Sequence, residues 1–252
     1  MIFLEAMTPP PSLAVIACAV LEDETRHFAR EMPHVREIVI LPQGLHREPL
    51  GLQRELQTAI DRAEALPGIE AIALVYGLCS RGVENLRHGR CPLVIARAHD
   101  CVTLFLGSKE RYAAYAREHP GTYWYTPGWI KTGTQPGPDR AANRREEYAA
   151  KFDADDVEYL VDMDRQGLAH YTQATYVDIG VGGTAQGMAY TRHCADCLGW
   201  SFDQVNGDPS LLRDLMACRW DEDRFLVVPP HHFIRLTVAD HIIEAVPETP
   251  KP

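Results

Sequence analysis

Short, uninterrupted apolar segments alternate with longer amphipathic segments through the first half of this chain. Leu13–Ala17, Ala71–Tyr76 and Leu93–Ala96 carry an apolar side chain at every position, and Leu50–Leu66 repeats its apolar residues at helical spacing. A strand that is apolar throughout is buried on both faces, and buried strands separated by helices pair in parallel. The pattern therefore predicts an α/β protein with a parallel sheet and helices on both of its faces.

The expected elements continue along the chain, more loosely in its second half. Strands are predicted at Ser12–Val20, Arg36–Leu41, Glu70–Tyr76, Cys91–Ala96, Gly121–Tyr125, Ala174–Ile179 and Phe225–Val228, and helices at Glu22–Met32, Leu50–Leu66, Asp100–Gly107, Arg140–His170, Ala185–Leu198 and Asp208–Cys218. We expect two facing α/β lobes, residues 1–130 and 131–252, with the site between them at the carboxyl ends of the strands. One continuous sheet is the alternative.

Composition excludes several classes of protein. The net charge of -10 argues against a nucleic-acid partner, because phosphate binding requires clustered Lys and Arg. No segment approaches the ~20 apolar residues that span a bilayer. The first residues, 1–11, lack the charge and apolar pattern of a signal peptide. We therefore expect a cytoplasmic protein, whose seven cysteines stay reduced and serve as ligands, nucleophiles or small core residues.

Three of the cysteines follow predicted strands. Cys18 comes after Leu13–Ala17, Cys79 follows Ala71–Tyr76, and Cys101 lies just past Leu93–Ala96. The carboxyl ends of parallel strands share one edge of a sheet, so these thiols are expected to lie close together.

A histidine accompanies the third cysteine, in the segment His99-Asp100-Cys101. Thiolate and imidazole are the preferred ligands of zinc, so Cys18, Cys79, His99 and Cys101 are predicted metal ligands, with Asp100 orienting His99. Three cysteines with no fourth also suit a four-iron cluster with one open iron, and ligand softness does not choose between the two metals. The alternative for Cys18 is a buried core residue.

Three other patterns carry weaker predictions. Gly180, Gly182 and Gly183 precede a helix and resemble a phosphate cradle for a cofactor, but the full Gly-x-Gly-x-x-Gly spacing is missing and a simple tight turn is the favoured interpretation. Tyr125 ends an aromatic strand and is predicted to line the site, with core packing as the alternative. Cys194 and Cys197 form a Cys-x-x-Cys pair late in a predicted helix, where ordinary helix residues are the simpler interpretation.

The cysteine segments also carry a family resemblance. Ala17-Cys18, the loop Tyr76–Gly82, the segment Arg97–Cys101 and the strand Pro120–Thr126 resemble the bacterial and archaeal family catalogued as domain of unknown function 1638, with a match from about Leu13 to Pro230. Its members occur beside corrinoid-dependent methyltransferase genes and in nitrogenase gene neighbourhoods. The resemblance implies metal or one-carbon chemistry and supports the three cysteines as the site; it does not extend to Cys194, Cys197 or His232.

The functional expectation is a metal-dependent enzyme, a transferase that acts on a small molecule, with methyl transfer to or from a thiol as the reaction. Zinc is the expected cofactor and an iron–sulfur cluster the alternative. A carrier or accessory protein that holds a metal, cluster or cofactor for a partner enzyme is the competing class. A corrinoid protein or methyltransferase is the expected partner, with neither nucleic acid nor membrane involved.

Overall fold

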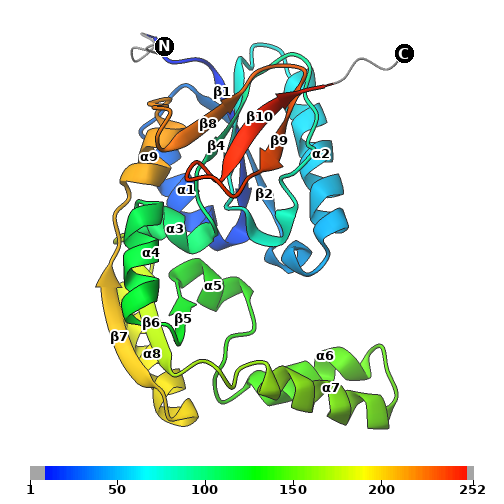
Figure 1. The fold of residues 1–252 in the computed structure, drawn as a ribbon, viewed down its shortest axis with the longest axis vertical. Coiled ribbons are helices and arrows are strands. Elements are labelled where there is room, and N and C mark those ends of the chain that lie inside the picture. Colours follow the sequence, from blue (N-terminus) through cyan, green and yellow to red (C-terminus); the bar gives the residue numbers. More distant parts are fainter. Residues whose placement is uncertain (1–8, 249–252) are drawn as a thin grey trace. The chain divides into compact units, whose positions relative to one another are not determined.

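The computed structural model describes residues 9–248 (Figure 1). Within that range the chain forms two compact units. The first contains the residues up to Tyr112 and those from Gly207 onward, and the second is Ala113–Asn206. The chain therefore leaves the first unit, builds the second and returns, whereas the sequence pattern predicted a second lobe over residues 131–252.

The first unit is built on a five-stranded sheet. Its strand order is β2-β1-β3-β4-β8, with parallel pairing throughout except for the antiparallel pair β4 and β8. The strands are β1 (Leu13–Cys18), β2 (Val35–Leu41), β3 (Ala71–Val75), β4 (Leu93–Ala96) and β8 (Phe225–Val228). Every residue of β1, β3 and β4 is buried, as expected for apolar strands that are covered on both faces. The predicted α/β class with parallel sheets is confirmed.

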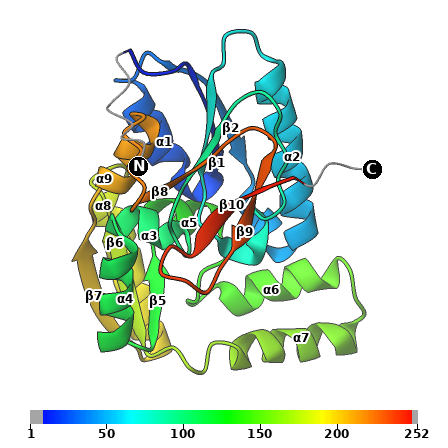
Figure 2. The ribbon, with the colours of Figure 1, turned by 45° about the horizontal axis from the view of Figure 1, so that its top comes forward.

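Helices cover both faces of this sheet. Figures 1 and 2 show α1 and α9 on one side of the strands and α2 on the other. The helices of this unit are α1 (Glu22–Ala29), α2 (Pro49–Ala65), α3 (Cys101–Leu106) and α9 (Ser210–Met216), and α4 (Lys109–Glu118) leads into the second unit. Helix α2 buries Leu52, Leu56 and Ile60, which are the apolar positions whose spacing predicted it.

The strand order reverses direction between β1 and β3. From β1 the chain moves outward to β2, and then crosses back to place β3 on the other side of β1. In open α/β sheets, ligands bind outside the carboxyl ends of the strands at such a reversal. The carboxyl ends of β1 and β3 are therefore the place where this fold positions a site.

Two ionic side chains, the partly buried Glu64 and the buried Arg97, fix loops around the sheet. Glu64, in the last turn of α2, accepts hydrogen bonds from the backbone N–H groups of Gly89, Arg90 and Cys91, just before β4. Burial raises the pKa of Glu64, but the three N–H donors outweigh it, and the net pKa is lowered. The carboxylate thus ties the β4 entry loop to the end of α2.

Arg97, directly after β4, holds a hairpin against the sheet by hydrogen bonds, and this hairpin was not predicted from the sequence. This hairpin consists of β9 (His232–Leu236) and β10 (Ile243–Pro247). The guanidinium donates to the carbonyls of Glu222, His241 and Ile243 at 2.9, 2.8 and 2.6 Å. Burial lowers the pKa of Arg97, because it removes water from the charged guanidinium, and the carboxylates of Glu222 and Asp223 offset this only in part.

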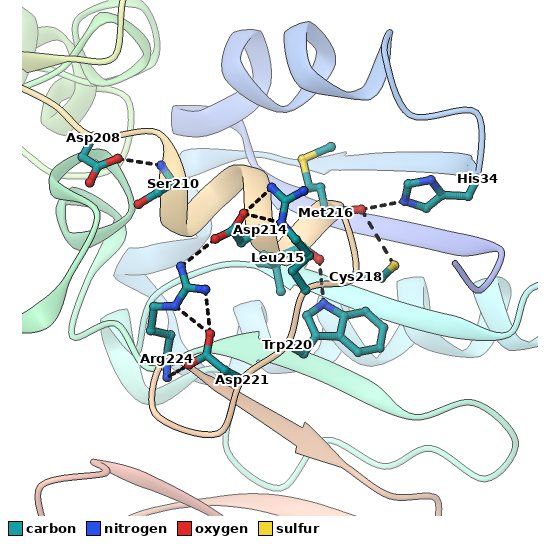
Figure 3. Close-up of polar contacts among 11 residues, drawn as sticks. His34, Asp208, Ser210, Asp214, Leu215, Met216, Cys218, Trp220, Asp221 and Arg224 are labelled. Atoms are coloured by element: carbon teal, nitrogen blue, oxygen red, sulfur yellow. Dashed lines mark hydrogen bonds and ion pairs between the residues drawn. The ribbon is translucent and has the colours of Figure 1, made fainter. Parts of the chain in front are cut away.

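The returning segment packs through α9 and the turn after it, shown in Figure 3. Asp214 accepts hydrogen bonds from Arg219 and from Arg224, the latter at 2.7 Å, and Trp220 Nε1 donates to the Leu215 carbonyl at 2.7 Å. His34 Nε2 donates to the Met216 carbonyl at 2.8 Å. The His34 contact joins the end of α9 to the segment before β2, and the other contacts hold the returning segment to its own turn.

The second unit has its own parallel sheet, in the order β5-β6-β7. Its strands are β5 (Thr122–Tyr125), β6 (Gln173–Asp178) and β7 (Ser201–Asn206), and its helices are α5 (Pro127–Thr132), α6 (Arg140–Ala149), α7 (Ala154–Gln166) and α8 (Thr184–Leu198). Helix α8 packs on β6 and β7, and α6 packs on α7. The single helix expected over Arg140–His170 is two helices, because Asp153 begins α7 with an N-cap hydrogen bond to the Asp156 N–H.

Candidate metal centre

The three cysteines lie at the carboxyl edge of the first unit's sheet. Cys18 is the last residue of β1, Cys79 begins a 3₁₀ turn after β3, and Cys101 is the first residue of α3, after β4. Cys18 and Cys101 are buried and Cys79 is partly exposed. All three are free thiols. The edge they occupy is the one at which the strand order reverses.

The donor atoms at this edge are close to one another. Cys18 Sγ lies 3.2 Å from His46 Nε2, and Cys79 Sγ lies 4.0 Å from Cys101 Sγ. One ligand atom from each of Cys18, His46 and Cys101 falls within 4.8 Å of the other two. Two donors at ~2.0–2.3 Å from one tetrahedral ion stand roughly 3.5–3.8 Å apart, so this group could hold a metal ion.

The imidazole of the group comes from His46, which was not among the ligands predicted from the sequence. His46 lies in a 3₁₀ turn, Gln43–Arg47, that directly follows β2. Because β2 pairs in parallel with β1, and Cys18 is in register with Leu41, the turn after β2 emerges at the same edge as Cys18. The rule that located the cysteines would have located His46 as well, had it been applied to the second strand.

His99 and Asp100 have other places in the structure. His99, predicted as a ligand, is exposed, and its ring lies near Tyr112 with the ring centroids 6.4 Å apart. Asp100, predicted to orient His99, is the N-cap of α3 and accepts hydrogen bonds from the Thr103 N–H and hydroxyl at 3.0 and 3.2 Å. The Asp100 carboxylate therefore fixes the start of α3, and in this way it positions the Cys101 thiol and not the His99 ring.

A glycine brings the loops after β3 and β4 together. A Cβ on Gly77 would lie 2.3 Å from the carbonyl carbon of Asp100 and 2.4 Å from its Cα, so only glycine permits this approach. The next residue, Leu78, donates its N–H to the Ala98 carbonyl at 3.0 Å. This contact between the two backbones sets the distance between Cys79 and Cys101.

Neighbouring thiols raise the pKa values of two of the cysteines, Cys79 and Cys101. The hydrogen bond with Cys101 and then burial raise the pKa of Cys79, and His46 lowers it by less. The pKa of Cys101 is raised well above its usual value, chiefly by its hydrogen bond with Cys18. Several thiolates in one small volume repel, and a cation removes that repulsion. The cluster therefore has the electrostatics of a cation site.

The remaining predicted residues belong to the second unit. Tyr125 is buried in that unit's core and donates to the Pro136 carbonyl at 2.6 Å, so its hydroxyl has a structural partner. It lies in a different sheet from the cysteines, contrary to the expectation of a shared edge. Gly180, Gly182 and Gly183 form the turn between β6 and α8, and the first two have positive φ values of 78° and 89°.

Among the described residues, the other four cysteines are not members of the Cys18–His46–Cys101 group. Cys194 and Cys197 lie in α8, where Cys194 is buried with Tyr125 and Cys197 is exposed. Cys218 is buried in the turn after α9, with its thiol 3.9 Å from the Met216 carbonyl (Figure 3). Cys91 is buried before β4 with its thiol 3.4 Å from the Ile69 carbonyl.

Fold and site together define an α/β protein with a cysteine- and histidine-lined centre at the carboxyl edge of a parallel sheet. The model of the family described as "Protein of unknown function (DUF1638)" matches residues 40–216, which is more than half of the chain. The chain belongs to this family. No curated protein and no solved structure matches it. Across residues 9–248, none of the helices has the length and apolar character needed to cross a membrane.

Proposed function

We propose that this protein is a zinc-dependent transferase that moves a methyl group between a small thiol and a corrinoid-type carrier, using the centre formed by Cys18, His46 and Cys101. The observation that carries the proposal is the convergence of these three donors, from three different strand ends, within 4.8 Å. Three protein ligands with an exchangeable fourth position are the arrangement of catalytic zinc.

Zinc fits the donor set better than an iron–sulfur cluster. One donor is an imidazole, and the sulfurs of Cys79 and Cys101 are only 4.0 Å apart. Cysteines that ligate separate irons of a cluster stand further apart than two ligands of a single ion, since a cluster has one iron for each cysteine. Mixed nitrogen and thiolate ligands at single-ion spacing are typical of zinc.

The chemistry follows from the ligands. A bound zinc ion would supply Lewis acidity, which lowers the pKa of a coordinated substrate thiol into the neutral range. In the transfer, the substrate thiolate attacks the methyl group of the corrinoid: a sulfur–carbon bond forms, the cobalt–carbon bond breaks with both electrons left on cobalt, and the thiol proton passes to solvent. Cys79 and His46 are the partly exposed members of the cluster, so a substrate approaches from their side.

A second candidate is a metal carrier for a partner enzyme. The position of Cys79 favours it, because a fourth thiol 4.0 Å from Cys101 could close the coordination sphere. Four protein ligands are typical of sites that hold zinc without turning over a substrate. The two candidates share the same centre and differ in the role of Cys79.

Metal analysis of protein purified without oxygen tests the centre. We expect about one equivalent of zinc in the wild type and severe loss in Cys18→Ala, His46→Ala and Cys101→Ala, because each removes one of three ligands. His99→Ala and Cys218→Ala are the matched controls and should retain zinc. Zinc that is absent from the wild type, or equally retained by the His46 and His99 variants, would refute the centre.

Methyl transfer distinguishes the two functions. Loss of the methylcobalamin absorption spectrum is followed with 2-mercaptoethanol as the acceptor. The transferase should turn over, and Cys79→Ala should retain both zinc and turnover. A carrier should show no turnover, and Cys79→Ala should release zinc readily to a chelator, which would decide against the transferase.

A further inference from the structure

The centre contains a buried hydroxyl that has no hydrogen-bond partner. Tyr76 is 0% exposed, and its OH is one of a small number of buried polar side-chain atoms in the described residues that make no hydrogen bond. Leaving a buried polar group unsatisfied costs about 1–3 kcal/mol. Phenylalanine would fill the same space without this cost, so the hydroxyl at this position requires a reason other than packing.

The backbone places Tyr76 beside the metal ligands. It directly follows Val75, which is in register with Ala17, so Tyr76 and Cys18 are neighbours at the ends of adjacent parallel strands. Residues at matching positions of neighbouring strands direct their side chains to the same face of a sheet. The Tyr76 ring also lies next to the His46 ring, with the centroids 6.1 Å apart.

The surrounding sulfurs do not satisfy this hydroxyl. Cys18, Cys79 and Cys101 are near enough to raise the pKa of Tyr76, although burial is the larger cause. Yet the hydroxyl makes no hydrogen bond with any of them. The Tyr76 hydroxyl is therefore close to the thiols and free to donate to an atom of a small molecule bound between them.

From this geometry we infer that the Tyr76 hydroxyl donates a hydrogen bond to the sulfur of a small thiolate substrate bound at the Cys18–His46–Cys101 centre. The inference rests on the proposed function and adds a substrate-binding residue to it. A neutral phenol suits an anionic sulfur, because hydrogen bonds to a charged acceptor are roughly twice as strong as neutral ones. The phenol orients the substrate while it keeps its own proton.

Cobalt-substituted protein provides the test. The wild type and Tyr76→Phe are loaded with Co²⁺ and titrated with 2-mercaptoethanol, and the visible cobalt spectrum reports both metal occupancy and thiolate binding. We expect equal cobalt occupancy and about tenfold weaker binding of 2-mercaptoethanol in Tyr76→Phe, which corresponds to the loss of one hydrogen bond to a charged group. Tyr176→Phe, which alters another fully buried tyrosine, in β6 of the second unit, is the matched control and should bind the thiol as the wild type does.

The outcomes separate this inference from the function on which it rests. Equal thiol affinity in the wild type and Tyr76→Phe overturns the role of the hydroxyl and leaves the metal centre standing. Loss of cobalt from Tyr76→Phe also overturns it, because the hydroxyl would then support the metal ligands and not the substrate. A wild type that takes up no cobalt refutes the centre, and this inference with it. Thiol-free Tyr76→Phe should be at least as stable as the wild type, since it loses an unsatisfied group.

Discussion

Replacing Gly77 with alanine should disrupt the metal centre without touching any of its ligands. The added Cβ would lie 2.3 Å from the Asp100 carbonyl carbon, against about 3.4 Å for ordinary contact, so one of the two loops must move by about 1 Å. Both neighbours are backbone atoms, and no side-chain rotation relieves the clash. Because Cys101 directly follows Asp100, the shift moves the Cys101 sulfur relative to Cys18 and His46, the other two donors of the centre.

The magnitude follows from the tolerance of metal coordination. Ligand distances hold to within roughly 0.2 Å, so a displacement of about 1 Å exceeds what one coordination sphere absorbs. We expect Gly77→Ala to weaken zinc binding on the order of 100-fold, the upper end for changes that displace ligands indirectly. Overpacking should also lower the free energy of unfolding by about 1–3 kcal/mol.

Competition with a chromogenic chelator measures zinc affinity, and urea unfolding of the metal-free protein measures stability. Gly44→Ala is the matched control, because Gly44 lies two residues before His46 and an added Cβ meets nothing within 4 Å. It should bind zinc as the wild type does. If Gly77→Ala and Gly44→Ala behave alike in both assays, the contact between the two loops does not set the geometry of the centre.

Two further predictions concern the groups that fix the surrounding loops. Glu64→Gln should lower the free energy of unfolding by about 1–2 kcal/mol at neutral pH, since it weakens three hydrogen bonds to a carboxylate that is partly screened by solvent. The folded-state pKa of Glu64 is depressed, so its contribution is complete above the unfolded value of about 4.3 and is lost as the pH falls through the folded value. Urea unfolding from pH 7 downward should show the difference disappear below that range; a difference that persists in acid, or an equal loss in the exposed control Glu55→Gln, contradicts this account. Arg97→Lys should lower the free energy of unfolding by about 2–4 kcal/mol, because an ammonium group cannot reach all three carbonyls that the guanidinium joins. Urea unfolding measures the change, and a loss below about 0.5 kcal/mol would show that the carbonyls find other partners when the guanidinium is removed.

The sequence was informative where structure depends on local pattern. The apolar runs of β1, β3 and β4 predicted a parallel sheet, and their ends predicted the edge at which the cysteines lie. The pattern had no comparable signal for β7 (Ser201–Asn206), none of whose residues is buried, or for the β9–β10 hairpin. The hairpin depends on Arg97, which lies more than a hundred residues earlier in the chain.

The ligand set shows the same limit at the level of single residues. Proximity in sequence favoured His99, two positions before Cys101, yet its side chain is exposed. The neighbouring imidazole is that of His46, 28 residues after Cys18, brought there by the pairing of β1 and β2. Spacing along the chain predicts ligands that come from one loop. When the ligands come from several loops, their proximity depends on the strand order, which is determined by tertiary packing and cannot be read from local sequence patterns.

The return of the chain to its first unit has a consequence for synthesis. Cys18, His46, Cys79 and Cys101 all lie within the first 101 residues, whereas β8, which pairs with β4, begins at Phe225. During translation, the donors and the four parallel strands emerge well before the strand that covers the β4 edge. An open strand edge is a site of mispairing between nascent chains, and the metal proposed for the centre would stabilise the partial sheet at that stage by joining three strand ends. Zinc supply during expression should therefore govern the yield of soluble protein as well as its final metal content.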